Sequence, residues 1–253
     1  MESLFTVKDL KNLYQLAKIR NRSREDYFQF QKFQGELLVR FLKNNISFNP
    51  GDLILDLGCA FGGYSSALKK AGARVIGLDL APMKNPDGVP MLNSDANQIP
   101  VSPGTFDMII CASLIEHVVA PEVLIEECLR VLKAGGLLYL SFPPYYSPNG
   151  GHQFAPYHLL GQRFAIWMAG KRGLYKDDPW LEERFKKNPE NYRDAFGKWG
   201  LYKMTITKAR KIIRRLPVTL VKRATRYLPV DVSGIPLIGE LITWHVQYLL
   251  KKR

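Results

Sequence analysis

The chain has 253 residues, of which 46% are hydrophobic and 23% charged, so it can bury one sizeable core as a globular protein. Its three cysteines show no metal-binding spacing, and no stretch of about 18 apolar residues is uninterrupted, which argues against a disulfide scaffold and a membrane span. The first residues, MESLFTVKDLKNLY, lack the apolar run of a signal peptide, and we expect a cytoplasmic protein.

Residues 1–48 are expected to form an N-terminal helical cap. Ser23, followed three residues later by Asp26, is typical of a helix N-terminus, and it precedes a helical pattern over 25–45. The turn sequence Asn49-Pro50-Gly51 should end that helix.

Residues 49–143 show apolar strands that alternate with helices. Such runs, apolar throughout, predict a parallel sheet covered by helices on both faces. The strands are expected at 53–58, 74–80, 89–95, 106–113 and 137–142, and the helices at 62–72 and 121–133.

Residues 203–253 allow two interpretations. A helix over 203–216, capped by Thr205 or Thr207, and strands within 217–229 and 243–250 would complete a seven-stranded, mostly parallel, Rossmann-like α/β sheet. Alternation along 243–250 then predicts one apolar face and an exposed His245. The alternative is a basic amphipathic helix that lies on a membrane.

The sequence LILDLGCAFGG at 53–63 contains the strongest functional signal. Gly58, Ala60 and Gly62 predict a tight turn between strand and helix, where small residues let a ligand touch the backbone. The spacing of Gly58, Ala60 and Gly63 also matches a dinucleotide site. Asp56 favours a different ligand, because its carboxylate would repel a pyrophosphate but attract the ammonium of a methionine group beside a sulfonium.

Two more acidic residues follow the next two strands. Asp79 ends the second strand, where a carboxylate can bind both hydroxyls of a ribose. Asp95 and Ala96 follow the third strand, where the carboxylate could accept a hydrogen bond from an adenine amino group. Each aspartate alone would be interpreted as a helix cap, but their order and spacing favour a ligand site.

The run from Leu53 to Pro143 resembles the class I S-adenosylmethionine-dependent methyltransferases with a DxGxGxG turn, although Ala60 replaces the usual second glycine. The resemblance implies S-adenosyl-L-methionine as cofactor and Glu116-His117 just beyond its site. The implied cofactor-binding residues are Asp56, Gly58, Cys59, Ala60 and Gly62 for the methionine half, Asp79 and Leu80 for the ribose, Asp95 and Ala96 for the adenine, and Cys111 and Ala112 through their backbone.

Residues 144–202 form an insertion after the fifth strand, the place where this superfold carries substrate recognition. Thirteen aromatic residues lie between Tyr145 and Tyr202, which suits a carbohydrate or aromatic acceptor. Tyr145, Tyr146 and His158 are the candidate substrate-binding residues. The alternative is a small helical subdomain that packs its own core.

Transfer of the activated methyl to a hydroxyl needs one general base, and the candidates are His152, His117 and Glu116. The spacing of six between His152 and His158 matches no zinc signature, so we expect no metal ion.

Residues 203–253 hold 12 of the Lys and Arg residues against two acids, in a chain of net charge +13. This basic region could contact the inner face of an anionic membrane or a phosphorylated substrate, or it could be a solvated surface.

Taken together, the sequence features lead us to expect a methyltransferase that acts on a hydroxyl of a small-molecule or glycan acceptor. The alternatives are a quinone or lipid methyltransferase, an RNA methyltransferase supported by charge alone, and a regulatory protein that binds the cofactor without turnover; a nucleic-acid partner is not expected.

Overall fold

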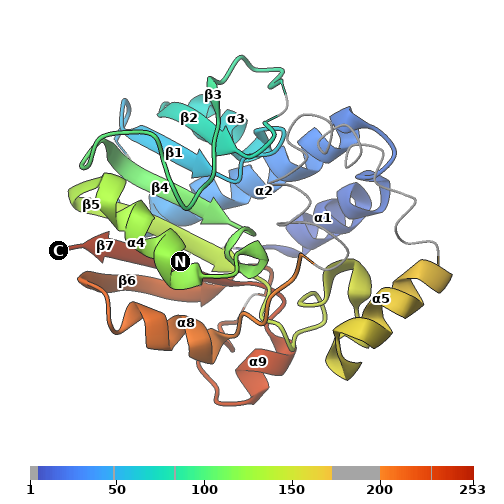
Figure 1. Cartoon of the computed structure of the whole chain (residues 1–253). Coiled ribbons are helices and arrows are strands. Elements are labelled where there is room, and N and C mark those ends of the chain that lie inside the picture. The colour runs from blue at the N-terminus through green and yellow to red at the C-terminus, as the bar shows by residue number, and fades with distance from the viewer. Residues whose placement is uncertain (1–4, 48, 83, 173–199, 229) are drawn as a thin grey trace.

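The computed structural model describes residues 5–47, 49–82, 84–172, 200–228 and 230–253, and it contains a seven-stranded sheet in the order β3-β2-β1-β4-β5-β7-β6 (Figure 1). All neighbouring strands are parallel except β7, which is antiparallel to β5 and β6. The predicted mostly parallel, Rossmann-like sheet is therefore confirmed. The strands are β1 (Leu53–Leu57), β2 (Arg74–Asp79), β3 (Met91–Asn93), β4 (Phe106–Ala112), β5 (Leu132–Phe142), β6 (Val218–Thr225) and β7 (Val246–Lys252).

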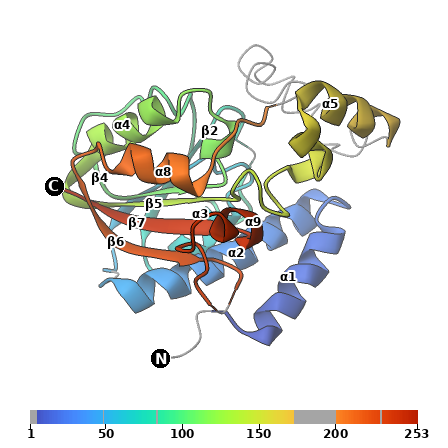
Figure 2. The ribbon, with the colours of Figure 1, turned by 90° about the horizontal axis from the view of Figure 1, so that it is seen from below.

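Helices cover both faces of this sheet (Figure 2). On one face, α2 (Arg24–Asn45) and α3 (Gly63–Lys70) bury Leu42 and Leu68 against the strands. On the other face, α4 (Pro121–Val131) and α8 (Ile206–Ile213) bury Leu124 and Ile212. The central strands are mostly apolar, with Asp56 of β1 and Asp107 of β4 as exceptions, because helices exclude water from both of their faces.

The N-terminal helices begin at hydrogen-bonded caps. The Ser23 hydroxyl accepts the Asp26 N–H at 3.0 Å where α2 begins, as the sequence predicts. An additional helix, α1 (Val7–Ile19), begins at a capping box formed by Thr6 and Asp9. Leu13 of α1 packs on α2, so these helices form one layer.

The boundary between α4 and β5 differs from the expectation of a helix over 121–133 and a strand from 137. The helix ends at Val131, and β5 begins at Leu132, which pairs with Phe106 of β4. Pairing with β4 outweighs the helical pattern of Leu132 and Lys133, which is why the strand is longer than expected.

The C-terminal strands are present, and the helix before them is capped by Thr205, whose hydroxyl accepts the Lys208 N–H at 3.0 Å. The expected exposure of His245 is wrong, because the residue is only 6% exposed. Since β7 lies between β5 and β6 and both of its faces are covered, strict alternation does not separate a buried from an exposed face. Within the described ranges, no helix is long and apolar enough to cross a membrane.

The described part of the insertion comprises short helical segments with a small apolar cluster of their own. Phe154 packs there with Ala165, Ala169 and Leu201. Its elements are η2 (His152–Phe154), η3 (Tyr157–Leu160) and α5 (Gln162–Lys171). The expected aromatic residues at 173–199 lie outside the described residues, and the division of the chain into segments 1–48, 49–143, 144–202 and 203–253 stays a prediction.

Candidate active site

The turn after β1 has the backbone conformation that its small residues allow. Gly58, Ala60 and Gly62 all have positive φ angles, of 76°, 47° and 74°. A Cβ atom at Gly62 would lie 2.3 Å from the Met91 Cε atom and 2.4 Å from the Asn85 Nδ2 atom. A larger residue at Gly62 would have to displace these side-chain ends and adopt a strained left-handed backbone. The turn lies at the carboxyl edge of the sheet, with Gly58 partly buried and residues 59–62 buried.

Asp79, at the end of β2, is tied to this turn. Its Oδ2 atom accepts the Ala60 N–H at 3.0 Å, and its Oδ1 atom accepts the Ala81 N–H at 2.9 Å. Each carboxylate oxygen can accept more than one hydrogen bond. Asp79, with the partly buried Leu80 beside it, therefore fits a ribose diol while it also fixes the turn.

Asp56 is almost completely buried beneath the same turn, at 3% exposure. The Ser65 hydroxyl donates to its Oδ2 atom at 2.5 Å. Burial raises the pKa of Asp56 to about 6, against the lowering effect of Ser65 and with a smaller raising effect from Asp79. A ligand ammonium would favour the charged carboxylate, which suits the methionine half of the cofactor. The sequence did not single out Ser65.

The residues expected at the adenine lie at the end of β3. Asp95 accepts hydrogen bonds from the backbone and the side-chain amide of Asn97 at 2.8 and 3.0 Å, and Ala96 is buried. The Asn97 Oδ1 atom is buried without a hydrogen-bond partner among the described residues. An adenine amino group would supply the missing donor. Asn97 is thus a candidate that sequence reasoning missed.

The cysteines near this site point their thiols into the core. Cys59 and Cys111 are both buried, and burial raises the pKa of the Cys111 thiol. The Cys59 Sγ atom lies 3.9 Å from the Met91 Sδ atom. Cys59, Cys111 and the partly buried Ala112 could therefore contact a cofactor through backbone atoms, not through reactive thiolates.

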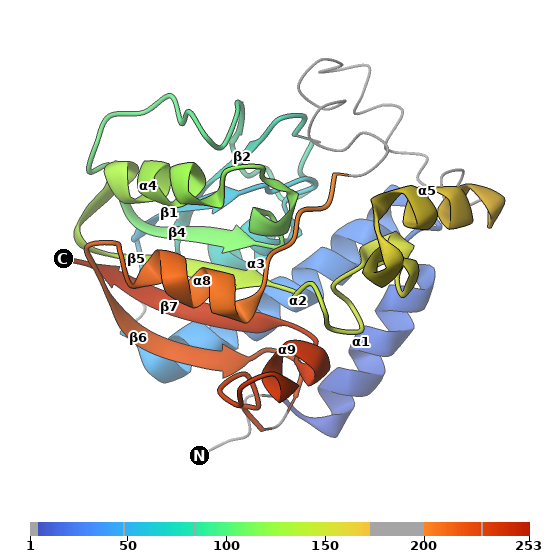
Figure 3. The same cartoon turned by 60° about the horizontal axis from the view of Figure 1, so that its bottom comes forward.

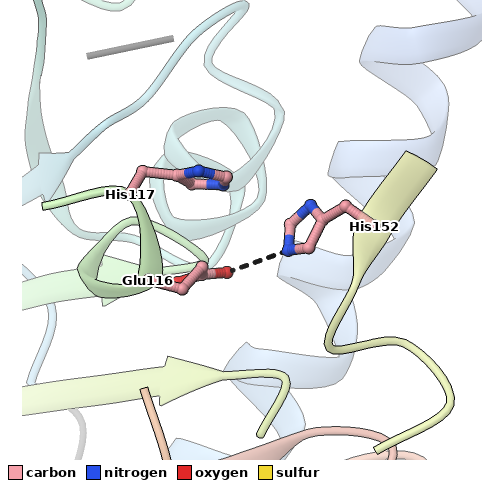
Figure 4. Close-up of side chains that lie close together, drawn as sticks. All are labelled: Glu116, His117 and His152. Carbon is pink, nitrogen blue, oxygen red and sulfur yellow. Dashed lines mark ion pairs between the residues drawn. The ribbon is translucent and has the colours of Figure 1, made fainter. Parts of the chain in front are cut away.

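Glu116, His117 and His152 meet at the carboxyl edge of the sheet (Figure 4). Glu116 and His117 lie in η1 (Ile115–His117), directly after β4, and His152 opens η2. The His152 Nε2 atom is 3.6 Å from the Glu116 Oε1 atom, and the two imidazole rings pack edge to face with their centroids 4.9 Å apart. The fold thus brings together all three expected catalytic residues, which we call the Glu116 cluster.

The charges in the Glu116 cluster are set by burial. Glu116 is 1% exposed, neither of its carboxylate oxygens has a hydrogen-bond partner in the described ranges, and burial raises its pKa to about 7. The His152 side chain is 27% exposed; partial burial, with Arg20 and His158 nearby, lowers its pKa below the ordinary value. His152 is therefore a neutral imidazole at neutral pH.

Tyr145 and His158 brace the loop that follows β5. The His158 Nε2 atom lies 2.7 Å from the Tyr145 carbonyl oxygen, and the Tyr145 hydroxyl donates to the His158 carbonyl at 3.0 Å. Tyr146 is 36% exposed, with the Lys203 ammonium 4.7 Å from its ring centroid. Contact of these three residues with an acceptor stays a prediction.

The buried His245 contacts the same edge of the sheet. Its Nε2 atom is 3.0 Å from the hydroxyl of Ser113, the residue after β4. This contact links the C-terminal strands to the loop that carries Glu116, and it explains why His245 is not exposed.

The fold and the residues at its carboxyl edge define a Rossmann-like protein with a candidate site for an adenosine-containing cofactor that carries an amino-acid tail. Comparison with known proteins agrees, since residues 55–140 match the methyltransferase domain family. An uncharacterised methyltransferase of Mycobacteroides abscessus is 31% identical over 171 residues, or 63% of this chain and 64% of the relative. A ubiquinone biosynthesis O-methyltransferase of Xanthomonas campestris is 36% identical over 105 residues, or 36% of this chain and 43% of the relative.

Solved structures share the fold. An S-adenosylmethionine-dependent methyltransferase from Mesorhizobium loti superposes with a TM-score of 0.55 at 17% identity, over 86% of this chain and 98% of that one. A second such methyltransferase, from Archaeoglobus fulgidus, superposes with a TM-score of 0.53 at 15% identity, over 90% of this chain and 97% of that one. The chain is therefore similar to S-adenosylmethionine-dependent methyltransferases in the family match over residues 55–140 and in its fold, which indicates S-adenosylmethionine as the cofactor. Its matches span less than two thirds of the length of these curated relatives.

Proposed function

We propose that the protein transfers the methyl group of S-adenosylmethionine to a hydroxyl oxygen of a small-molecule or glycan acceptor. The Glu116 cluster carries this proposal, because a neutral imidazole and a buried carboxyl group lie together at the edge of the sheet. When bound, the cofactor supplies a methyl group already activated by its sulfonium. The protein then has to hold the hydroxyl in line with that methyl and help it to lose its proton.

Each part of the site has a role in this proposal. Asp56 balances the cofactor's ammonium charge, Asp79 binds the ribose, and Asp95 with Asn97 receives the adenine. His152, His117 and Glu116 act on the acceptor hydroxyl from the loops after β5 and β4. Tyr145, Tyr146 and His158 shape the acceptor side of the site. The name of the Xanthomonas campestris relative, an O-methyltransferase, supports an oxygen acceptor.

A screen for S-adenosylhomocysteine release tests the proposal. The purified protein is incubated with S-adenosylmethionine and, separately, with sugar nucleotides, lipid-linked sugars, hydroxylated aromatics, quinols and RNA. Release with a hydroxylated small molecule or glycan, and a product methylated at oxygen, would support it. Turnover on RNA alone, methylation at nitrogen, or cofactor binding without turnover on any acceptor would contradict it.

Asp79→Asn is expected to weaken S-adenosylhomocysteine binding by roughly 10- to 150-fold, because one charge-assisted acceptor of the ribose hydroxyls is lost, about 1.5–3 kcal/mol. Asparagine keeps the shape and one of the oxygens that hold the turn. Calorimetry with wild type and variant measures the effect, with Glu126→Gln, an exposed change on α4, as the control. Wild-type protein that bound NAD and not S-adenosylhomocysteine would contradict the cofactor assignment.

A second candidate is an acceptor carried by a membrane, such as a quinone or a lipid. One observation favours it: a groove of about 580 Å³ between α8 and β6 is lined by Arg210, Arg214, Arg223 and Arg253 around apolar side chains. The short helix α9 (Ile238–Ile242) lies near α8 (Figure 3). Leu241 of α9 is exposed, and Glu240 accepts the backbone N–H groups that begin α8. Basic and apolar groups on one surface suit an anionic membrane.

Vesicle sedimentation measures this second candidate. Arg214→Gln with Arg253→Gln is expected to weaken binding to phosphatidylglycerol-containing vesicles on the order of thirtyfold, at about 1 kcal/mol for each basic residue. Lys8→Gln with Lys11→Gln, on exposed positions of α1, removes the same charge elsewhere and serves as the control. Equal binding by both double variants, or no binding by wild type at low salt, would contradict a membrane-borne acceptor.

A further inference from the structure

The carboxyl group of Glu116 is buried in the site without a hydrogen-bond partner among the described residues. It is 1% exposed, and both of its oxygens are buried without a hydrogen-bond donor among the described residues. A buried carboxylate without a partner is strongly unfavourable, so a compensating group is expected. The His152 Nε2 atom lies 3.6 Å from the Glu116 Oε1 atom, which is beyond hydrogen-bond distance.

The orientation of His117 adds a second observation. Its Nδ1 atom is 2.5 Å from the Gly200 carbonyl oxygen, which can only accept a hydrogen bond. In a neutral imidazole Nδ1 would therefore carry the proton, and Nε2 would be the atom able to act as a metal ligand. A backbone carbonyl that fixes the far nitrogen in this way is the usual outer support of a metal-binding histidine.

We propose that Glu116, His117 and His152 bind one divalent transition-metal cation. Each side chain offers one ligand atom, and these atoms all lie within 4.8 Å of one another. Metal–ligand bonds of about 2.0–2.2 Å place ligand atoms roughly 3–4 Å apart, so small side-chain rotations close the site. Figure 4 shows the carboxylate of Glu116 and the His152 ring directed toward each other, with the His117 ring above them.

The ligand set decides which kind of cation fits. Two imidazoles and one carboxylate suit Zn²⁺, Co²⁺, Mn²⁺ or Fe²⁺, whereas Mg²⁺ prefers an all-oxygen set. Three protein ligands leave at least one coordination position open, as in catalytic metal sites. The cation would supply the positively charged partner that the buried Glu116 carboxylate lacks among the described residues.

The catalytic consequence of this inference rests on the proposed function, whereas metal binding itself does not. At the open position the cation could hold the oxygen of the acceptor and make its hydroxyl more acidic. Glu116, His117 and His152 would then assist proton loss by holding the cation, and would not themselves act as the base.

Metal binding is tested on the EDTA-treated, full-length protein without cofactor or acceptor. Titration with ZnCl₂ by calorimetry, and with CoCl₂ by visible absorption, should show one ion per chain. His152→Gln, His117→Gln and Glu116→Gln should each lower the affinity at least about tenfold, and Glu126→Gln should not. Unchanged S-adenosylhomocysteine affinity checks that the variants are folded.

Absence of stoichiometric binding, or variants that bind the ion as tightly as wild type, would overturn the inference. The two proposals fail separately in this design. If the protein binds no ion and still methylates a hydroxyl in the presence of EDTA, the proposed function is supported and the metal site is rejected. An ion bound by these three residues, without methylation of any hydroxylated acceptor, leaves the metal site and rejects the proposed function.

Discussion

Replacement of His152 with alanine is expected to lower kcat on the acceptor on the order of 10²- to 10⁴-fold, the range contributed by a group that assists proton transfer. Glu116→Gln should also lower kcat, because the carboxylate is lost while its volume is kept. Neither residue belongs to the cofactor-binding turn, so the affinity for S-adenosylhomocysteine should change by less than about twofold. Initial rates at saturating cofactor, with calorimetry alongside, measure both quantities.

The controls separate catalysis from folding. Glu126→Gln makes the same chemical change as Glu116→Gln at an exposed position of α4, and it should leave kcat unchanged. Glu116→Gln should not destabilise the protein, because no hydrogen bond to the carboxylate is lost in the described structure. If His152→Ala and His117→Ala both keep near-wild-type turnover from about pH 6 to about pH 9, the histidines have no part in the proton transfer.

The sheet could be predicted because its signals are local. Apolar runs mark the central parallel strands, alternation marks the last strand, and Gly58 and Gly62 mark the turn whose backbone favours glycine. Strand order then places the residues after β1, β2 and β4 at one edge, since the carboxyl ends of parallel strands meet there. The meeting of Glu116-His117 with the His152 loop follows from the same topology.

The contacts within the site could not be predicted, because they depend on side-chain directions across distant segments. The pairing of Ser65 with Asp56 and the orphaned oxygen of Asn97 have no signature in residue spacing. Among the metal ligands we propose, Glu116 and His117 are adjacent, but His152 follows them 35 residues after His117. A search for short spacings between ligands therefore does not find this set. His245 was mispredicted for two reasons. It lies just before β7, where it contacts Ser113, and both faces of β7 are covered, whereas alternation assumes one solvent-facing side.

Asp56→Asn is expected to stabilise the cofactor-free protein while it weakens cofactor binding. Burial raises the pKa of Asp56 from 3.8 to about 6, so the folded state holds a proton that the unfolded state releases between these values. The free energy of unfolding is therefore highest, as far as this group is concerned, below about pH 3.8, and it falls as the pH rises through about 6. At about 1.4 kcal/mol per pKa unit, ionisation of Asp56 costs about 3 kcal/mol at neutral pH, which is an upper estimate of the gain in the variant.

Cofactor affinity should show the opposite dependence on pH. The ammonium of S-adenosylhomocysteine favours the charged carboxylate, so wild-type affinity should be about tenfold weaker near pH 5 than near pH 7.5, where Asp56 is ionised. Asp56→Asn should bind more weakly near pH 7.5 and lose this pH dependence, because no titrating charge remains beneath the turn. Calorimetry at both pH values and urea unfolding of the cofactor-free proteins measure the two effects. A variant that unfolds more easily at neutral pH, yet keeps wild-type affinity and its pH profile, would show that Asp56 supports the turn through Ser65 and does not face the cofactor.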